Sequence, residues 1–497
     1  MTNGADIDAK KAMLHGAMWT VAMRWGGKFL GLISTIIVAR LVLPEDYAVI
    51  AMAMLVVGLL EAFIDLGAAT ALIREPKPNT DFINSAWTLR FCQSAIVSLL
   101  LLTLASPCAA FFNEPNVAPI LLLLAGCMLL NGANNFGLVL ARKALNFALD
   151  FKVQIIAKSC QVLATVIAAY YLGDYRALAI GVALGYLLGF ILSYVMHPYR
   201  PWFCTRAWPQ IWQFSKWLII ANSAQYLLQK LDQLVAGRTG TSHEFGLYNV
   251  GGDLGQLPTA ELGPAIIKSF LPVLSSIQDQ PERVNRGVLK VLAILNTLTL
   301  PVGFGIAVIA DPLGNLMLGP NWQGVAPFIA LFGICSAFKV APKPLSSLLL
   351  LHGYSKNQSG ILVIELVSFI LAAWLLMPLY GLVGLVLARI SAAILVIFAF
   401  CYEAQQKCAL PFWQPLSTLV RPLACALIMY WSCTELLKQL NLNNDLYQLA
   451  VAIPSGALIY GVLMWVLWLL CRKPMGLEQE ICLWLAQKFK PKGSPQV

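Results

Sequence analysis

The chain has 497 residues, of which 59% are hydrophobic and 12% charged, with a mean hydropathy of +0.73 and a net charge of +10. Soluble globular proteins carry about 25% charged residues, so this composition excludes a soluble protein and indicates a polytopic membrane protein. The basic residues lie between apolar runs rather than on a soluble domain, which argues against nucleic acid as a partner.

Apolar runs of about 20 residues, the length of a membrane-spanning helix, recur along the whole chain. They lack the strict alternation of barrel strands, so the predicted fold class is an all-α polytopic membrane protein. The loops between them are short and leave no room for an extramembrane catalytic domain. The fourteen predicted spans are 17–42, 47–73, 83–105, 117–140, 154–172, 177–196, 215–236, 246–274, 288–310, 323–350, 358–377, 380–401, 415–437 and 446–471.

The loop charges predict the orientation of the chain. Lysine and arginine are concentrated in alternate loops, whereas the loops on the other side hold only Arg176, Arg238 and Lys438. By the positive-inside rule, both termini face the cytoplasm. After Arg472, the segment GLEQEICLWLAQKFK predicts a short amphipathic helix at the membrane surface. Its apolar residues have helical spacing: Leu477, Ile481, Trp484 and Leu485.

An internal repeat indicates two lobes. Residues 16–51 align without a gap with residues 214–249, which pairs Trp19 with Trp217 and Arg40 with Arg238. Six predicted spans separate the copies, so both run in the same direction through the membrane, as in transporters built from parallel repeats. The predicted domains are an N-lobe at 1–200, a C-lobe at 201–402, two additional helices at 403–471 and a cytoplasmic tail at 472–497.

Two cations interrupt the first apolar run. Arg24 and Lys28 lie one helical turn apart, about 10 Å and 16 Å from its start at Ala17. A cation at that depth costs about 2.5–3.5 kcal/mol unless it meets water or a partner. One interpretation is that Arg24 reaches the headgroups while Lys28 pairs with an acid. The other is that both line an aqueous lumen and attract an anionic substrate.

Further charges lie inside predicted spans. The cations Arg90, Lys158 and Lys230 favour a basic cavity. Each acid is interpreted either as a structural counter-ion or as a site for a coupling H⁺ or Na⁺. Asp65, which precedes Leu-Gly, is interpreted as structural. The four acids are Glu61, Asp65, Asp232 and Glu365.

Amide and aromatic side chains form a second set of candidates. Asn134, Asn222, Gln225 and Tyr226 lie within predicted spans, where they suit either sugar hydroxyls or ordinary helix packing. The cysteines and histidines show no metal-binding spacing, so no metal site is predicted. No nucleotide-binding loop or nucleophile motif occurs, so we expect no cofactor and no enzyme activity.

Loop motifs give the chain a resemblance to a known family. ARLVLPEDYAVIAMA and FIDLGAATALI are followed in order by ARKALNF, LDQLVAGRTGTSHEFGLYNV, FLPVLSSIQDQPERV and LMLGPNWQGVAPFIALFG. This succession resembles bacterial lipid-linked oligosaccharide flippases, the Wzx-type polysaccharide transporters of the MOP exporter superfamily. The resemblance implies a two-lobed, MATE-like bundle in the bacterial inner membrane.

The resemblance also implies a function. Such proteins are expected to move undecaprenyl-pyrophosphate-linked oligosaccharide repeat units from the cytoplasmic to the periplasmic leaflet, by alternating access through a cationic lumen. The surface polymer would be an O-antigen, a capsule or an exopolysaccharide. Expected partners are the bilayer, the polysaccharide polymerase and the chain-length machinery. Arg24, Lys28, Arg90, Lys158 and Lys230 would hold the pyrophosphate and acidic sugars.

Two other functions stay open at this point. A MATE-like drug or ion antiporter would show twelve spans and an acid-dominated cavity for cationic drugs. An integral-membrane polymerase or ligase would show a long periplasmic loop with paired acids or arginines. Neither pattern occurs in the sequence.

Overall fold

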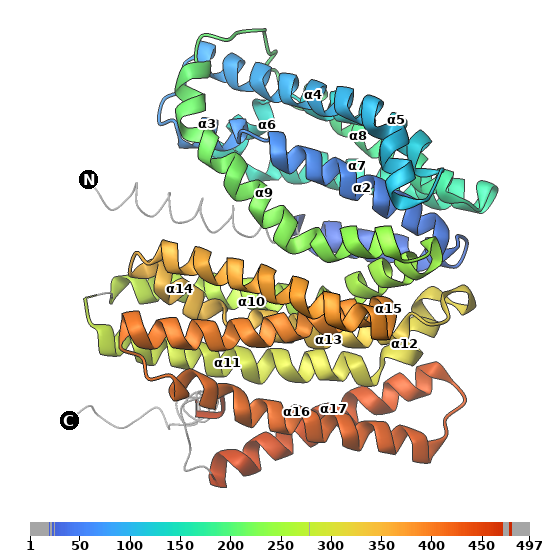
Figure 1. The fold of residues 1–497 in the computed structure, drawn as a ribbon. Helices are drawn as coiled ribbons and strands as arrows, with labels where there is room; N and C mark the ends of the chain where they lie inside the picture. The colour runs from blue at the N-terminus through green and yellow to red at the C-terminus, as the bar shows by residue number, and fades with distance from the viewer. Residues whose placement is uncertain (1–18, 20–21, 24, 278, 471–476, 480–497) are drawn as a thin grey trace, which may run out of the picture. The chain divides into compact units, whose positions relative to one another are not determined.

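The structure is a computed structural model that describes residues 19, 22–23, 25–277, 279–470 and 477–479. Every regular element in this part of the chain is a helix (Figure 1), which confirms the predicted all-α fold class. Arg24 lies outside the described residues. The helix predicted after Arg472 also lies outside them, apart from residues 477–479.

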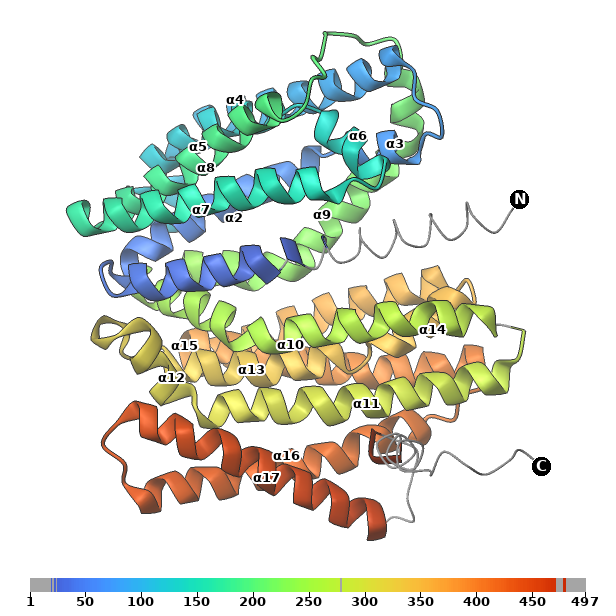
Figure 2. The ribbon, with the colours of Figure 1, turned by 180° about the vertical axis from the view of Figure 1, so that it is seen from behind.

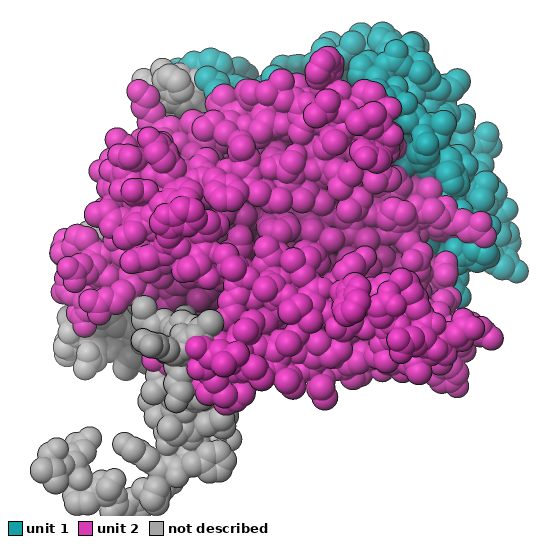
Figure 3. All heavy atoms as spheres, turned by 60° about the horizontal axis from the view of Figure 1, so that its bottom comes forward, with its two compact units in different colours: residues 1–246, 318–321 teal, residues 247–317, 322–497 magenta. Residues whose placement is uncertain are grey.

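The chain divides into two compact units, coloured separately in Figure 3. The first comprises Met1–Gly246 with Leu318–Asn321, and the second comprises Leu247–Met317 with Trp322–Val497. The lobes predicted at 1–200 and 201–402 follow the sequence repeat and stay a prediction. The compact units follow packing, because the helix that begins after residue 200 packs within the first unit.

Long helices and two short ones build the first unit. An apolar helix at Trp25–Ala39 precedes them. Within this unit α7 and α8 run side by side, as Figures 1 and 2 show, and α9 packs along α2. The helices are α2 (Pro44–Ile64), α3 (Ala68–Arg74), α4 (Thr80–Phe112), α5 (Val117–Gly132), α6 (Gly137–Lys143), α7 (Phe147–Leu172), α8 (Tyr175–Val195) and α9 (Trp208–Thr239).

Side chains break two predicted spans of this unit into separate helices. Between α2 and α3, Asp65 Oδ1 accepts a hydrogen bond from the Gly67 N–H at 2.9 Å. Between α5 and α6, which meet at 55°, Asn135 Oδ1 accepts one from the Gly137 N–H at 2.8 Å. Such local bonds offer the backbone an alternative to the helix, so predicted spans 47–73 and 117–140 are each divided into two helices.

The second unit is also a helical bundle. α10 (Ser242–Ser276) begins in the first unit and continues into the second. Within the second unit α11 packs against α13, α16 and α17. The remaining elements of the chain, which belong to the second unit except for residues 318–321, are α11 (Pro281–Val308), α12 (Ala310–Leu318), η1 (Pro320–Trp322), α13 (Ala326–Val340), α14 (Lys343–Leu351), α15 (Ser355–Cys408), α16 (Trp413–Leu440) and α17 (Asp445–Leu470).

α15 consists of two arms that meet at a sharp turn. Gly381 has φ 58° and ψ −139°, a conformation that favours glycine. A Cβ on Gly384 would lie 2.3 Å from the carbonyl oxygen of Leu376, a separation that a continuous helix does not allow. The chain therefore reverses here, in agreement with the two spans predicted at 358–377 and 380–401.

The number of membrane spans remains a prediction. Among the described residues, nine helices are long and apolar enough to cross a membrane, or ten if the bent pair α5 and α6 forms one span. α15 enters that number once despite its turn, and α9 and α10 do not enter it. The structure confirms that the chain consists largely of long helices, as the fourteen predicted spans require, whereas the number fourteen stays a prediction.

A polar face of α4 holds the chain just before α9. The buried hydroxyl of Thr88 accepts a hydrogen bond from the Cys204 N–H at 3.0 Å. The buried hydroxyl of Ser85 accepts one from the Ala207 N–H at 3.1 Å. Because these bonds satisfy backbone donors that lack a helical partner, they determine where α9 begins along α4.

Tyr226 joins α9 to α2. Its hydroxyl donates a hydrogen bond to the carbonyl oxygen of Leu55 at 2.9 Å. A Cβ on Gly58, one turn further along α2, would lie only 2.5 Å from that hydroxyl oxygen. Small residues allow helices to approach closely in a membrane, and Gly58 does so here.

We expect Gly58→Ala to displace the Tyr226 ring and to destabilise the protein by about 1–3 kcal/mol, because the added methyl group overlaps the phenol. Thermal unfolding in detergent measures the effect. Gly31→Ala is the matched control, since a Cβ on Gly31 meets no atom within 4 Å. Equal melting temperatures for the two variants would show that the close approach does not constrain α2 and α9.

Candidate functional site

A polar cavity within the first unit brings together residues that lie far apart in the sequence. We call it the Glu61 cavity; its volume is about 440 Å³. Six of the residues predicted from the sequence line it, on α2, α4 and α9. The lining residues are Glu61, Ala62, Asp65, Arg90, Asn222, Gln225, Tyr226 and Gln229.

The cation of the Glu61 cavity is paired. Arg90 Nη2 lies 3.3 Å from Glu61 Oε1, and the side chains are 25% and 33% exposed. The same oxygen accepts a hydrogen bond from Asn131 Nδ2 at 3.4 Å. Glu61 and Asp65 carry two negative charges against the one positive charge of Arg90, so the ionised cavity has a net charge of −1. That charge favours a cation, and the amides suit hydroxyl groups.

A second polar cavity in the same unit has the opposite charge. We call it the Lys158 cavity; it measures about 420 Å³ and lies among the first helix, α2, α7 and α8. Lys158 Nζ lies 3.3 Å from Gln161 Oε1. In the described chain, no carboxylate is within ion-pair distance of Lys158. The lining residues are Met23, Gly27, Met54, Gln154, Ile155, Ala157, Lys158, Gln161, Val182, Gly185 and Tyr186.

Three polar residues of the Lys158 cavity escaped the sequence analysis. Gln154 and Gln161 share one face of α7 with Lys158, at spacings of four and three residues. That pattern is visible in the sequence and could have identified them. Tyr186 comes from α8 and reaches the cavity only through tertiary packing. An ammonium group, two amides and a phenol together suit an anion or a group of sugar hydroxyls.

The other predicted site residues that the structure describes line neither polar cavity. Lys28 is half-buried in the first helix, directly after the cavity residue Gly27. Lys230 Nζ donates a hydrogen bond to Gln233 Oε1 at 2.9 Å. Asp232 is buried on α9, and Glu365 lies on α15 of the second unit.

Asn134 lies beside the wall of the Glu61 cavity. Its amide donates a hydrogen bond to Asn131 Oδ1 at 3.3 Å, and its carbonyl oxygen accepts one from Trp87 Nε1 at 3.1 Å. Asn131 in turn contacts Glu61. Asn134 is thus placed to orient the Glu61 carboxylate rather than to line the cavity.

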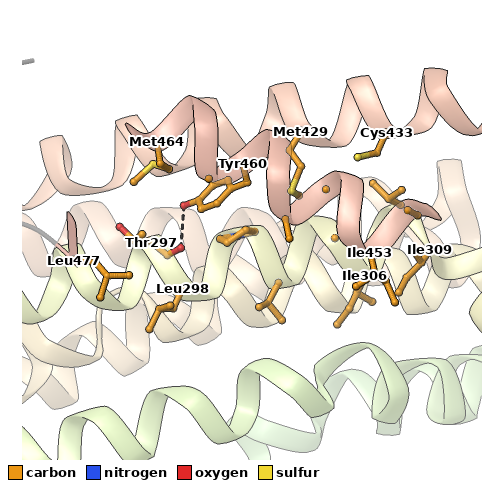
Figure 4. Close-up of a pocket in the computed structure, with 18 of the residues that line it drawn as sticks. Thr297, Leu298, Ile306, Ile309, Met429, Cys433, Ile453, Tyr460, Met464 and Leu477 are labelled. Atoms are coloured by element: carbon orange, nitrogen blue, oxygen red, sulfur yellow. Dashed lines mark hydrogen bonds between the residues drawn. The ribbon is translucent and has the colours of Figure 1, made fainter. Parts of the chain in front are cut away.

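The second unit contains an apolar cavity of about 710 Å³, the Tyr460 cavity (Figure 4). α11, α16 and α17 supply most of its lining. The Tyr460 hydroxyl donates a hydrogen bond to the Thr297 carbonyl oxygen at 2.9 Å, drawn as a dashed line in Figure 4. Its largely apolar walls suit a hydrocarbon chain.

Comparisons with known proteins place the chain among polysaccharide biosynthesis proteins. A family model described as "Polysaccharide biosynthesis protein" matches residues 37–327. Lipopolysaccharide biosynthesis protein WzxC of Escherichia coli (strain K12) is 22% identical over 69% of this chain and 71% of its own. Succinoglycan biosynthesis transport protein ExoT of Rhizobium meliloti (strain 1021) is 22% identical over 66% of this chain and 68% of its own.

Solved structures share the fold at low identity. Lipid II flippase MurJ in an inward closed conformation matches with a TM-score of 0.71 and 16% identity, over 91% of this chain and 99% of that one. An inward-facing MATE family multidrug transporter of the MOP superfamily matches with a TM-score of 0.59 and 15% identity, over 77% and 95%. These matches confirm the predicted MATE-like helical fold.

We expect the Glu61–Arg90 pair to contribute about 1 kcal/mol to the free energy of unfolding, because partial exposure weakens its Coulomb attraction. Glu61→Gln, Arg90→Met and the double variant form a thermodynamic cycle read by thermal unfolding. The exposed Arg206–Asp81 pair, at 2.9 Å, is the control and should show no measurable coupling. Additive effects of the Glu61 and Arg90 changes would contradict an interaction between them.

Proposed function

Because the chain belongs to the polysaccharide biosynthesis protein family, we propose that it is a flippase for undecaprenyl-pyrophosphate-linked oligosaccharide repeat units. It would carry them from the cytoplasmic to the periplasmic leaflet for O-antigen, capsule or exopolysaccharide synthesis. The names of WzxC and ExoT, a biosynthesis protein and a transport protein for surface polysaccharides, support this proposal. The same relatives favour a transporter over an enzyme.

One observation carries the proposal. The first unit contains helices long enough to cross a membrane, and a cavity among them holds a lysine, Lys158, that has no carboxylate partner in the described chain. An uncompensated cation inside a membrane bundle is costly and marks a path for an anion or for water. The oligosaccharide headgroup supplies both the anion and many hydroxyl groups. Lys158 would bind the anion, while Gln154, Gln161 and Tyr186 would bind hydroxyls.

The Glu61 cavity takes a different role in this proposal. Asn222, Gln225 and Tyr226 would contact neutral sugars, while Glu61 or Asp65 would take up a coupling H⁺ or Na⁺. Arg90 is the weaker candidate for the pyrophosphate, because Glu61 already offsets its charge. Arg24, Lys28 and Lys230 remain candidates for the pyrophosphate by the sequence argument alone.

The proposal includes a cellular context. The protein would lie in the bacterial inner membrane with both termini in the cytoplasm, and the polysaccharide polymerase and chain-length machinery would act next. The two sequence lobes would open the path to each side alternately. Support for this context comes from the positive-inside charge pattern and from the names of the relatives.

A drug or ion antiporter is the second candidate, and the net charge of −1 in the Glu61 cavity favours it. Such a protein would export lipophilic cations. Expression in a drug-sensitive strain measures this activity, and resistance that depends on Glu61 would support it. Loss of surface polysaccharide in a deletion strain, restored by the gene without any change in drug resistance, would favour the flippase.

We expect Lys158→Met to reduce export about tenfold or more, since a hydrogen bond to a charged group contributes about 1.5–3 kcal/mol. Surface polysaccharide in a flippase-deficient strain and flipping in proteoliposomes both measure it. Lys152→Met, on the exposed surface of the same helix, is the control and should retain wild-type export.

Two substrates identify the anion that Lys158 binds. If Lys158→Met reduces the transport of acidic and neutral repeat units equally, the ligand is the pyrophosphate. If it reduces only the transport of acidic units, the ligand is a sugar carboxylate. Wild-type transport of both substrates would exclude the Lys158 cavity from substrate binding.

A further inference from the structure

A short described segment that follows α17 in the sequence, residues 477–479, packs against the second unit. Residues 477–479 are helical, and Leu477 and Glu478 line the Tyr460 cavity. In Figure 4, Leu477 lies at one end of the labelled residues near Thr297 and Leu298, and Cys433 lies at the other end. The first apolar residue of the predicted amphipathic helix therefore contacts a cavity of the bundle.

A buried ion pair holds this segment in place. Arg421 Nη2 of α16 lies 2.7 Å from Glu478 Oε1, and the two side chains are 14% and 7% exposed. One oxygen and one nitrogen make this contact. Glu478 Oε2 and Arg421 Nη1 are also buried, and the described residues offer neither of them a hydrogen-bond partner.

The physical chemistry of such a pair favours reversible binding over permanent attachment. Removing two charges from water costs free energy that a single contact repays only in part, and each unsatisfied buried atom adds to the cost. Replacing a buried ion pair with hydrophobic side chains of similar volume often leaves the stability of a protein unchanged or increases it. When the segment leaves, both charged groups become hydrated again, which offsets part of the free energy lost with the ion pair. The contact therefore fixes where the segment binds and still allows it to dissociate.

We propose that residues 477–479 form a latch that closes one end of the Tyr460 cavity through the Arg421–Glu478 pair. Release of the latch opens that end of the cavity, which measures about 710 Å³ and has largely apolar walls, to a hydrocarbon chain. The role of the latch in transport rests on the proposed flippase function, whereas its closure of the cavity does not.

A reporter thiol inside the cavity tests the closure. Thr297→Cys suits this purpose because the buried Thr297 hydroxyl has no hydrogen-bond partner among the described residues, so a thiol replaces it without losing a bond. The full-length chain carries this thiol after its twelve native cysteines are replaced. N-ethylmaleimide labelling in native membranes gives the rate at which the cavity opens.

The expected result is slow labelling in the parent chain and labelling about tenfold faster or more in Glu478→Gln and Arg421→Gln. Arg421→Met/Glu478→Leu restores slow labelling, because apolar side chains seal the same contact without a desolvation cost. Glu282→Gln breaks an exposed ion pair on α11 of the same unit and leaves the rate unchanged. Equal labelling rates in all variants, at equal protein amounts, would overturn the latch.

Transport by the apolar double variant separates a latch from a fixed structural contact. A latch that must open predicts at least tenfold lower export by Arg421→Met/Glu478→Leu, while the melting temperature stays at or above that of the parent. Wild-type export by this variant would show that opening is not required. The labelling pattern does not depend on the flippase function. The labelling experiment therefore tests the latch, and the export experiment tests its role in transport.

Discussion

Charged side chains inside an apolar helix bundle need a partner, and this requirement shapes the whole molecule. Glu61 and Arg90 meet within the first unit, and Arg421 and Glu478 meet within the second. The ammonium group of Lys158 forms a hydrogen bond to an amide, and no described carboxylate pairs with it. Because hydrocarbon offers no hydrogen bonds, each of these groups must lie at a cavity or at a contact between helices. The positions of the charged side chains thus indicate where the bundle has a cavity or where two helices meet through polar groups.

The same requirement explains why several helices are broken. A backbone amide that leaves a helix inside the bundle needs another acceptor, and Asp65 and Asn135 supply one at the ends of α2 and α5. Asp65 thereby serves the turn and the Glu61 cavity at once. The turn at Gly381 of α15 instead relies on the backbone freedom of glycine.

The two units differ in chemistry in a way that suits an amphiphilic substrate. The first unit holds two polar cavities of opposite charge, and the second holds an apolar cavity with a charged pair at its edge. A polyprenyl-linked oligosaccharide combines a hydrated, anionic headgroup with a long hydrocarbon chain. Each kind of cavity by itself suits one of these parts, because burying a charge in hydrocarbon is costly.

The sequence by itself determined the fold class, and it predicted the spans and the set of intramembrane charges, because apolar length and loop charge are local properties of the chain. Only the tertiary structure decided which charges meet. Glu61 pairs with Arg90 across 29 residues, and Tyr226 packs on Gly58 across helices. It also separated Lys158 from the carboxylates and brought Tyr186 beside it. Such contacts depend on how helices rotate and break, which hydropathy alone does not encode.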